Sequence, residues 1–130
     1  MMAPDSNPFV GLDMASEADR MAATNPAAWM YERLALSIRD FEARLDAEHE
    51  IGARLAASAP GETVHIEDMG YWGPDLIIIH GHTEDGQPFR MMQHISQVNV
   101  VLVAVKKLKE KPNRIGFVLL EKVKEGKATS

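Results

Sequence analysis

Two histidines separated by one residue, His80 and His82, are the side chains whose spacing most directly suggests chemistry. They end a run rich in β-branched residues, Leu76 to His82, which predicts a strand. Because side chains alternate along a strand, both imidazoles would lie on one face, a usable spacing for two metal ligands. A zinc site needs a third and usually a fourth ligand, and the sequence places none. We therefore predict a pair of histidines on the polar face of a sheet, with no metal and no cofactor.

The histidine-bearing strand is expected to return through a hairpin, because Asp85-Gly86 is a strong turn signal and a second strand, Phe89 to Ile95, follows it. A loop of two or four residues would pair His82 with Phe89, His80 with Met91 and Ile77 with His94. In that register, His94 lies on the opposite face of the hairpin from the other two histidines.

The stretch from Gly61 to Asp75 holds further candidates for a functional surface. Its aromatic pair, Tyr71 and Trp72, either closes the core by packing on Trp29 and Tyr31 or forms a surface for a ligand or partner. The nearby carboxylates define no catalytic pair, because acid/base chemistry depends on a separation that the sequence does not fix. We predict a ligand- or partner-binding face of six residues: Asp68, Tyr71, Trp72, Asp75, His80 and His82. No catalytic residue is assigned, because no nucleophile elbow, phosphate loop, dinucleotide fingerprint or HExxH motif is present.

The first half of the chain must supply the helical support for this face. Thr24-Asn25-Pro26 is a strong helix start, and apolar residues from Met30 to Leu55 recur at steps of three and four, except at Glu48 and Gly52. The spacing predicts one helix over residues 26–57, about 48 Å long, which is more than a small domain covers. Either the helix breaks near residues 49–52 or its end packs on another copy. We favour the second interpretation and predict a homo-oligomer formed through helix 26–57.

The sequence pattern of the second half of the chain predicts five strands, over residues 62–67, 76–82, 89–95, 98–105 and 114–120. For residues 98–105, a helix begun by Ser96 is the alternative, but four valines in eight residues favour a buried strand. The predicted fold class is α+β, with a long N-terminal helix followed by about five antiparallel strands in a meander sheet or small barrel. One domain, residues 25–122, would stand between flexible tails over residues 1–24 and 123–130.

Composition limits the function classes. The chain has 130 residues, a net charge of −5 and no cysteine, which excludes disulfides, cysteine-ligated metals and thiol catalysis. Residues 1–95 carry 6 Lys/Arg against 16 Asp/Glu, whereas residues 96–130 carry 8 against 3, so only the C-terminal part could contact phosphate. No signal peptide and no apolar run of about 20 residues is present. We expect a cytoplasmic protein without a membrane span.

Two resemblances to known families arise, one over residues 25 to about 120 and one over two shorter segments. The run IEDMGYWGPDLI, residues 66–77, together with WMYERL and QHISQVNVVLVAVKK, resembles a family of small bacterial proteins that carry a domain of unknown function. This resemblance implies a bacterial source and no known activity. The segments EDGQPFRMMQHISQVNVVL and RIGFVLL are similar in order and spacing to the two motifs of Sm-like RNA-binding proteins. That similarity implies a ring of bent barrels, with Asn99 at a uracil and Gly116 in the second motif, although Ile95 and Glu121-Lys122 depart from the motifs.

The functional hypothesis is a non-enzymatic binding module that self-associates and binds a protein or small ligand. An Sm-like RNA-binding ring is the first alternative, in which nucleic acid is the partner. A metal-dependent enzyme that uses His80 and His82 is the second.

Overall fold

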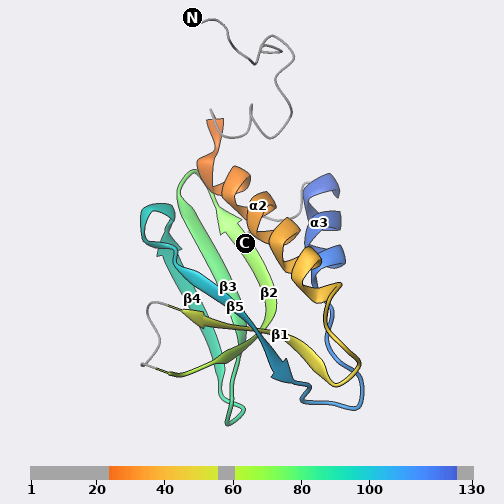
Figure 1. Cartoon of the computed structure of the whole chain (residues 1–130). Coiled ribbons are helices and arrows are strands. Elements are labelled where there is room, and N and C mark those ends of the chain that lie inside the picture. Colours follow the sequence, from red (N-terminus) through yellow and green to blue (C-terminus); the bar gives the residue numbers. More distant parts are fainter. Residues whose placement is uncertain (1–23, 56–60, 126–130) are drawn as a thin grey trace, which may run out of the picture.

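The structure is a computed structural model of the protein, and it describes residues 24–55 and 61–125. Helices and a curled antiparallel sheet of five strands form half a barrel (Figure 1), which confirms the predicted α+β class with a helix ahead of the strands. The predicted N-terminal tail lies, except for Thr24, outside the described residues. In chain order the elements are α2 (Pro26–Glu42), β1 (His49–Leu55), β2 (Val64–Trp72), β3 (Leu76–Thr83), β4 (Pro88–His94), the 3₁₀ turn η2 (Ile95–Gln97), β5 (Val100–Lys106) and α3 (Gly116–Glu125).

The strands are ordered β4-β3-β2-β1-β5, so the last strand returns to pair with the first. β5 pairs with β1 along its whole length, whereas β1 and β2 are paired only at Gly52–His65 and Ala53–Val64. β2 has a bulge between Ile66 and Asp68, where the register with β3 shifts. A bulge bends a strand and increases its twist. The bulge and the short β1–β2 pairing let the sheet curl around the helices.

The core lies between α2 and one face of the sheet, which we call the inner face. The buried residues of α2 recur every three or four positions, as an amphipathic helix requires, and the sheet contributes alternate residues of its strands. The main core side chains are Tyr31, Ala35, Ile38, Ile51, Ala53, Val64, Ile66, Met69, Ile77, Ile79, Ile115 and Leu119. Side chains of the intervening strand positions, such as Glu50, His65 and His82, lie on the opposite, outer face.

The predicted helix over residues 26–57 is wrong beyond Glu42, where α2 ends. Residues 49–55 form β1 instead, and Ile51, Ala53 and Leu55 are buried with a period of two. Gly52 allows close strand packing, because a Cβ there would stand 2.7 Å from a methyl carbon of Val105. Gly52, one of the two positions that broke the helical spacing, therefore belongs to a strand, and the other, Glu48, lies in the turn before it. No helix continues past Glu42 in the described part of this range, because residues 49–55 are a strand that is paired on each side. Self-association stays a prediction.

The strand predicted over residues 114–120 is also wrong, because α3 begins at Gly116. Two backbone N–H groups at its start, those of Ile115 and Gly116, donate to the buried carboxylate of Glu42 at 2.8 and 2.9 Å. A carboxylate at a helix N-terminus satisfies free amides and interacts favourably with the helix dipole. The five-stranded sheet therefore includes β1, which was predicted as helix, in place of the strand predicted over residues 114–120. The segment compared with the second Sm-like motif is mostly helical.

The β3–β4 hairpin forms where it was predicted, but its register differs by one residue. The loop has three residues, closed by a hydrogen bond from the Thr83 N–H to the Gln87 carbonyl at 2.8 Å. Gly86 has a φ of 87°, the left-handed conformation that a three-residue hairpin requires. The odd loop length pairs His80 with Arg90 and Leu76 with His94. All three histidines of the hairpin therefore share the outer face, and the predicted opposite orientation of His94 is wrong.

Residues 100–106 form a strand, which settles the strand-or-helix alternative for this segment. Within the described ranges, no helix is long and apolar enough to cross a membrane.

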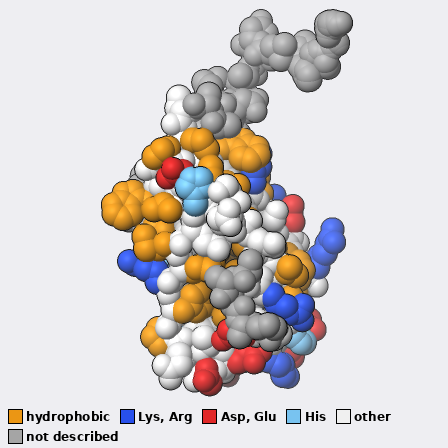
Figure 2. Space-filling model, turned by 90° about the vertical axis from the view of Figure 1, so that its left-hand side faces the viewer, with side chains coloured by type: hydrophobic (Ala, Val, Ile, Leu, Met, Phe, Trp, Pro, Cys, Tyr) orange, Lys and Arg blue, Asp and Glu red, His pale blue; other side chains and the backbone are white. Residues whose placement is uncertain are grey.

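Figure 2 views the molecule from the left-hand side of Figure 1, on which β4 lies. On this side of the molecule, hydrophobic side chains gather in the upper half and acidic side chains gather at the lower end.

Candidate ligand-binding cleft

The outer face carries two histidine–glutamate pairs on neighbouring strands. His65 and His82 lie opposite one another in the β2–β3 register. The Nδ1 atom of His82 is 2.8 Å from the carboxylate of Glu67, and both side chains are partly exposed. The Nδ1 atom of His65 is 2.8 Å from the carboxylate of Glu50, but here both side chains are buried. One pair is therefore open to solvent and the other is part of the structure beneath it.

The buried pair also anchors the segment that follows β5. The second carboxylate oxygen of Glu50 accepts the backbone N–H of Asn113 at 2.9 Å. Arg114 donates to the backbone carbonyls of His49 and Asp46, and the Lys107 N–H donates to the Glu48 carbonyl. These bonds hold residues 107–114 against β1. Buried polar groups that are fully hydrogen-bonded fix a local geometry. Residues 107–114 therefore have a defined position beside β1, and we call this segment the wall.

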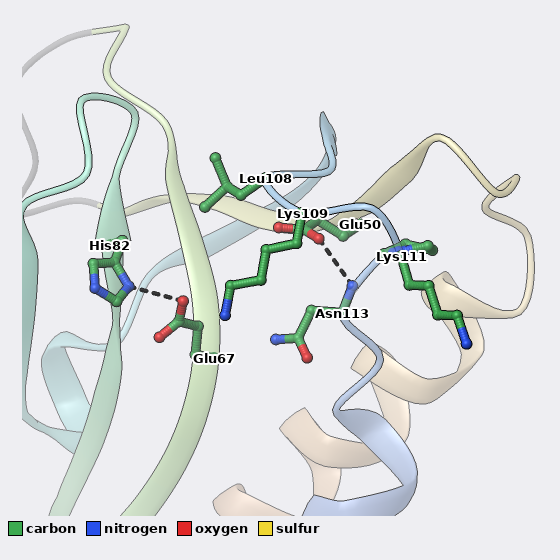
Figure 3. Close-up of a pocket in the computed structure, with 8 residues that line it drawn as sticks. Glu50, Glu67, His82, Leu108, Lys109, Lys111 and Asn113 are labelled. Carbon is green, nitrogen blue, oxygen red and sulfur yellow. Dashed lines mark hydrogen bonds and ion pairs between the residues drawn. The ribbon is translucent and has the colours of Figure 1, made fainter.

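Between this wall and the strands lies a hollow of about 400 Å³, the outer cleft. It is lined by Glu50, Glu67, His82, Leu108, Lys109, Lys111, Pro112 and Asn113. Figure 3 shows the side chains of Lys109 and Asn113 extending into the space beside Glu67, whereas the Lys111 side chain points away from it. The His82 ring nitrogen that is not bonded to Glu67 also points away from Lys109. The groups that converge on the space are thus an ammonium, a carboxamide and a carboxylate.

The charges of the outer cleft are unequally satisfied. Its carboxylates have partners, since Glu67 contacts His82 and Glu50 contacts both His65 and Asn113. Lys107, at the start of the wall, is paired with Glu48 at 3.1 Å and is not part of the cleft. Among the residues that the structure describes, Lys109 forms no ion pair and no side-chain hydrogen bond, and the same holds for the side-chain amide of Asn113. The unused hydrogen-bonding capacity in the cleft is therefore mainly donor capacity.

The six predicted site residues do not form one site. His82 lines the outer cleft, and His80 lies two positions earlier on β3, opposite Asp68 and Arg90. The other four each have different surroundings, and none of them lines the outer cleft. Asp68 forms an ion pair with Lys122 of α3, Tyr71 packs on Tyr31, Trp72 is 54% exposed, and Asp75 pairs with His94 at 3.4 Å.

Of the two aromatic residues Tyr71 and Trp72, one closes the core and the other lies on the surface. Tyr71 faces the core, with its ring centroid 5.6 Å from that of Tyr31 and the planes tilted by 58°. Burial, with the nearby charge of Asp68, raises the pKa of Tyr31 far above its ordinary value of 10. Trp72 lies on the other face of β2 and is exposed. Strand alternation, rather than a turn, separates the two side chains.

The histidines do not assemble a metal centre in the described part of the chain. No group of three or more histidine, aspartate or glutamate side chains there has a geometry that could hold a metal ion. The Nδ1 atoms of His65 and His82 each contact a different glutamate. The pair His80–His82 shares a face, as predicted, but no third ligand joins it.

Sequence patterns alone do not reveal most of the outer cleft. Local spacing assigns Glu50 to a solvated helix face, and composition assigns Lys109 and Lys111 to a solvated basic loop. The sequence does contain one signal for the cleft. A lysine-rich loop that directly follows a strand must lie next to the strand with which it pairs. Identifying β1 as that partner requires the β1–β5 pairing, which brings together residues about fifty positions apart.

Comparison with known proteins places the chain in a family. Residues 21–118 match the model of a family of unknown function, DUF6173, and the protein belongs to that family. The match confirms the expected domain of unknown function and includes every residue of the outer cleft. Searches of the curated proteins and of the solved structures gave no match.

Proposed function

We propose that the protein is a binding module that takes a small anionic molecule in the outer cleft. The observation that carries this proposal is the ammonium of Lys109, which has no partner among the described residues and extends over a hollow of about 400 Å³ beside the carboxamide of Asn113. The volume lies within the range of roughly 300–1,000 Å³ that small-molecule sites occupy. A carboxylate or phosphate oxygen would accept hydrogen bonds from both groups.

The surrounding residues support a rigid site for such a ligand. The backbone of Asn113 is anchored by the hydrogen bond of its N–H to buried Glu50, so the position from which its side chain extends is set before a ligand binds. Glu67 is held by His82 through one of its two oxygens, and the other oxygen is available to a donor group of the ligand. Leu108 and Pro112 supply the apolar part of the wall. The ligand that fits is small, anionic and carries a hydroxyl or amino donor.

The proposal is tested by titrating the protein with small anions and following binding by calorimetry and amide NMR shifts. The panel contains inorganic phosphate, a sugar phosphate, a hydroxy dicarboxylate and an amino acid, so that phosphate and carboxylate recognition are separated. We expect saturable one-to-one binding by at least one class, with shifts centred on residues 108–113 and on Glu67. Absence of saturable binding by every member at millimolar concentration would overturn the proposal.

The variants Lys109→Met and Lys111→Met separate a specific contact from general charge. Both remove one positive charge from the same loop, but only the Lys109 side chain extends into the cleft. A hydrogen bond to a charged group contributes about 1.5–3 kcal/mol, so Lys109→Met is expected to weaken binding by roughly 10- to 100-fold. Lys111→Met should change affinity by less than about threefold, the effect of a solvent-screened charge.

A further inference from the structure

A second hollow lies on the inner face, between α2 and the strands, and it is separate from the outer cleft. Its volume is about 180 Å³. Leu34 and Ile38 of α2 line one side, and Ile66, Met69, Ile79 and Leu102 of the strands line the other. Protein interiors contain few voids larger than a water molecule. We call this hollow the inner cavity.

The inner cavity exists because the half-barrel is not closed. β4 and β5 are the two ends of the strand order, and they do not pair with one another. α2 lies across the inner face but does not fill the space between β3 and β5. In the described residues its walls are apolar except for Ser37. An apolar cavity of about 150 Å³ stays dry in water and admits benzene, so this one is large enough for an apolar ligand.

A surface groove lies next to the inner cavity, at the N-terminal half of α2. Leu34, Ser37 and Val100 line both hollows, so the two adjoin one another. The groove is otherwise formed by Trp29, Met30, Arg33, Val98 and Asn99. A molecule that spans both hollows would meet polar groups in the groove and, apart from Ser37, apolar side chains in the cavity.

Arg33 lines this groove with hydrogen-bonding capacity unused. Its guanidinium lies over the ring of Trp29 at 5.2 Å, and its Nη2 atom contacts Glu32 at 3.2 Å. The Nε atom is buried and has no acceptor within the described part of the chain. A guanidinium presents a planar fork of donors that matches a carboxylate, and contact with an aromatic ring holds the fork in place. The groove is therefore suited to an anionic head group.

We propose that the groove and the inner cavity together bind a medium-chain monocarboxylate, with its chain in the cavity and its carboxylate at Arg33. A cavity of 180 Å³ exceeds the space that six benzene carbons need, and the groove extends it, so a chain of about six to ten carbons fits. The complementarity is of two kinds. Apolar walls match the chain, and the positive charge of the partly exposed Arg33 guanidinium matches the head group.

Octanoate at submicellar concentration is the probe, with methyl NMR of the full chain and calorimetry as readouts. We expect one-to-one binding and shifts of the Leu34, Ile79 and Leu102 methyl groups, none of which lines the outer cleft. Acetate, which lacks the chain, should leave these methyl signals unchanged, and octylamine should bind at least about tenfold more weakly than octanoate. Absence of methyl shifts with octanoate, or equal binding of octylamine, would overturn the proposal. If residues 1–23 or a second copy occupied the groove instead, octanoate would not shift these signals in the full chain.

Three variants sharpen the test. Arg33→Gln should weaken octanoate about tenfold or more while leaving binding of 1-octanol, which has no charge, nearly unchanged. Arg39→Gln is the matched control, because Arg39 is on the same helix and pairs with its following residue, Asp40, as Arg33 pairs with the preceding Glu32. Ser37→Phe places a ring where the groove meets the cavity, at an exposed position, so the fold is retained and octanoate binding is lost. Unchanged octanoate affinity in Ser37→Phe, or equal losses in Arg33→Gln and Arg39→Gln, would contradict the assignment.

Discussion

The buried carboxylate of Glu42 accepts the backbone N–H of Gly116 at 2.9 Å, and this contact joins the end of α2 to the beginning of α3. The same carboxylate accepts the N–H of Ile115 at 2.8 Å. α3 in turn packs beside α2 (Figure 1), and a Cβ at Gly116 would stand only 2.6 Å from the Cα of Arg39. The Glu42 side chain thus satisfies the first amides of α3 and stabilises residues 116–125 as a helix.

Replacing Glu42 by alanine is expected to lower the free energy of unfolding by about 2 kcal/mol or more, because two buried amides lose their acceptor. Urea unfolding with helix content followed by circular dichroism measures the effect. Asp40→Ala, which removes an exposed carboxylate from the same helix, should cost less than about 1 kcal/mol. Equal costs for the two variants would show that the Glu42 cap does not stabilise α3.

The hydroxyl of Tyr31 donates to the carbonyl of Leu119 at 2.8 Å, and burial raises the pKa of this phenol far above 10. A raised pKa in the folded state contributes stability that is fully present below pH 10 and is lost as the pH rises above it. Tyr31→Phe should cost about 1 kcal/mol at neutral pH through loss of the hydrogen bond. Urea unfolding of both proteins from pH 7 to above pH 10 should show the wild-type advantage shrinking in the alkaline range. A difference that stays constant across this range would contradict the expected coupling.

Gly81, between the two histidines of β3, is required by the neighbouring strand. A Cβ at this position would stand 1.8 Å from the backbone carbonyl oxygen of His65, and a backbone atom cannot move aside as a flexible side chain can. Gly81→Ala is therefore expected to destabilise the protein by about 3 kcal/mol, the upper end of the usual cost of overpacking. His80→Ala, one residue away, should cost under about 1 kcal/mol because that side chain is half-exposed. Thermal and urea unfolding of the pair would refute the argument if Gly81→Ala were the milder change.

Tyr71 and Trp72 should differ sharply in their contribution to stability, although they are adjacent. Tyr71 packs on Tyr31 in the core, so Tyr71→Ala should cost about 2 kcal/mol or more. Trp72 is 54% exposed, so Trp72→Ala should cost less than about 1 kcal/mol. Urea unfolding of both variants, followed by circular dichroism, measures the difference. A larger cost for Trp72 would mean that it closes the core.

Local sequence signals predict the elements whose partners are close in the chain. Asn25 caps α2, since its side chain accepts the Ala28 N–H at 3.1 Å, and Pro26 begins the helix. The β3–β4 hairpin follows from its Asp-Gly turn, and β5 follows from its valines. The one-residue error in the hairpin register arises because Gly86 forms a three-residue loop, which the Asp-Gly signal does not distinguish from loops of even length.

Elements that depend on distant partners are not predictable in this way. β1 is stabilised as a strand by its pairing with β5 from His49–Lys106 to Leu55–Val100, and α3 is stabilised as a helix by the Glu42 cap and by packing against α2. Both segments have apolar spacings that local propensity assigns to the other class, and tertiary contacts decide between them. The outer cleft escapes prediction for the same reason, because Glu50 and Asn113 meet only after β1 and β5 have paired.

The most direct measurement of the central claim is the affinity of the best-binding small anion for the wild-type protein, Lys109→Met and Lys111→Met, determined by calorimetry at one ionic strength. A ligand in the outer cleft predicts a roughly 10- to 100-fold loss for Lys109→Met and a change of less than about threefold for Lys111→Met. Equal losses in the two variants would contradict the account, because they would show that the anion responds to the net charge of the loop and not to the space beside Asn113 and Glu67.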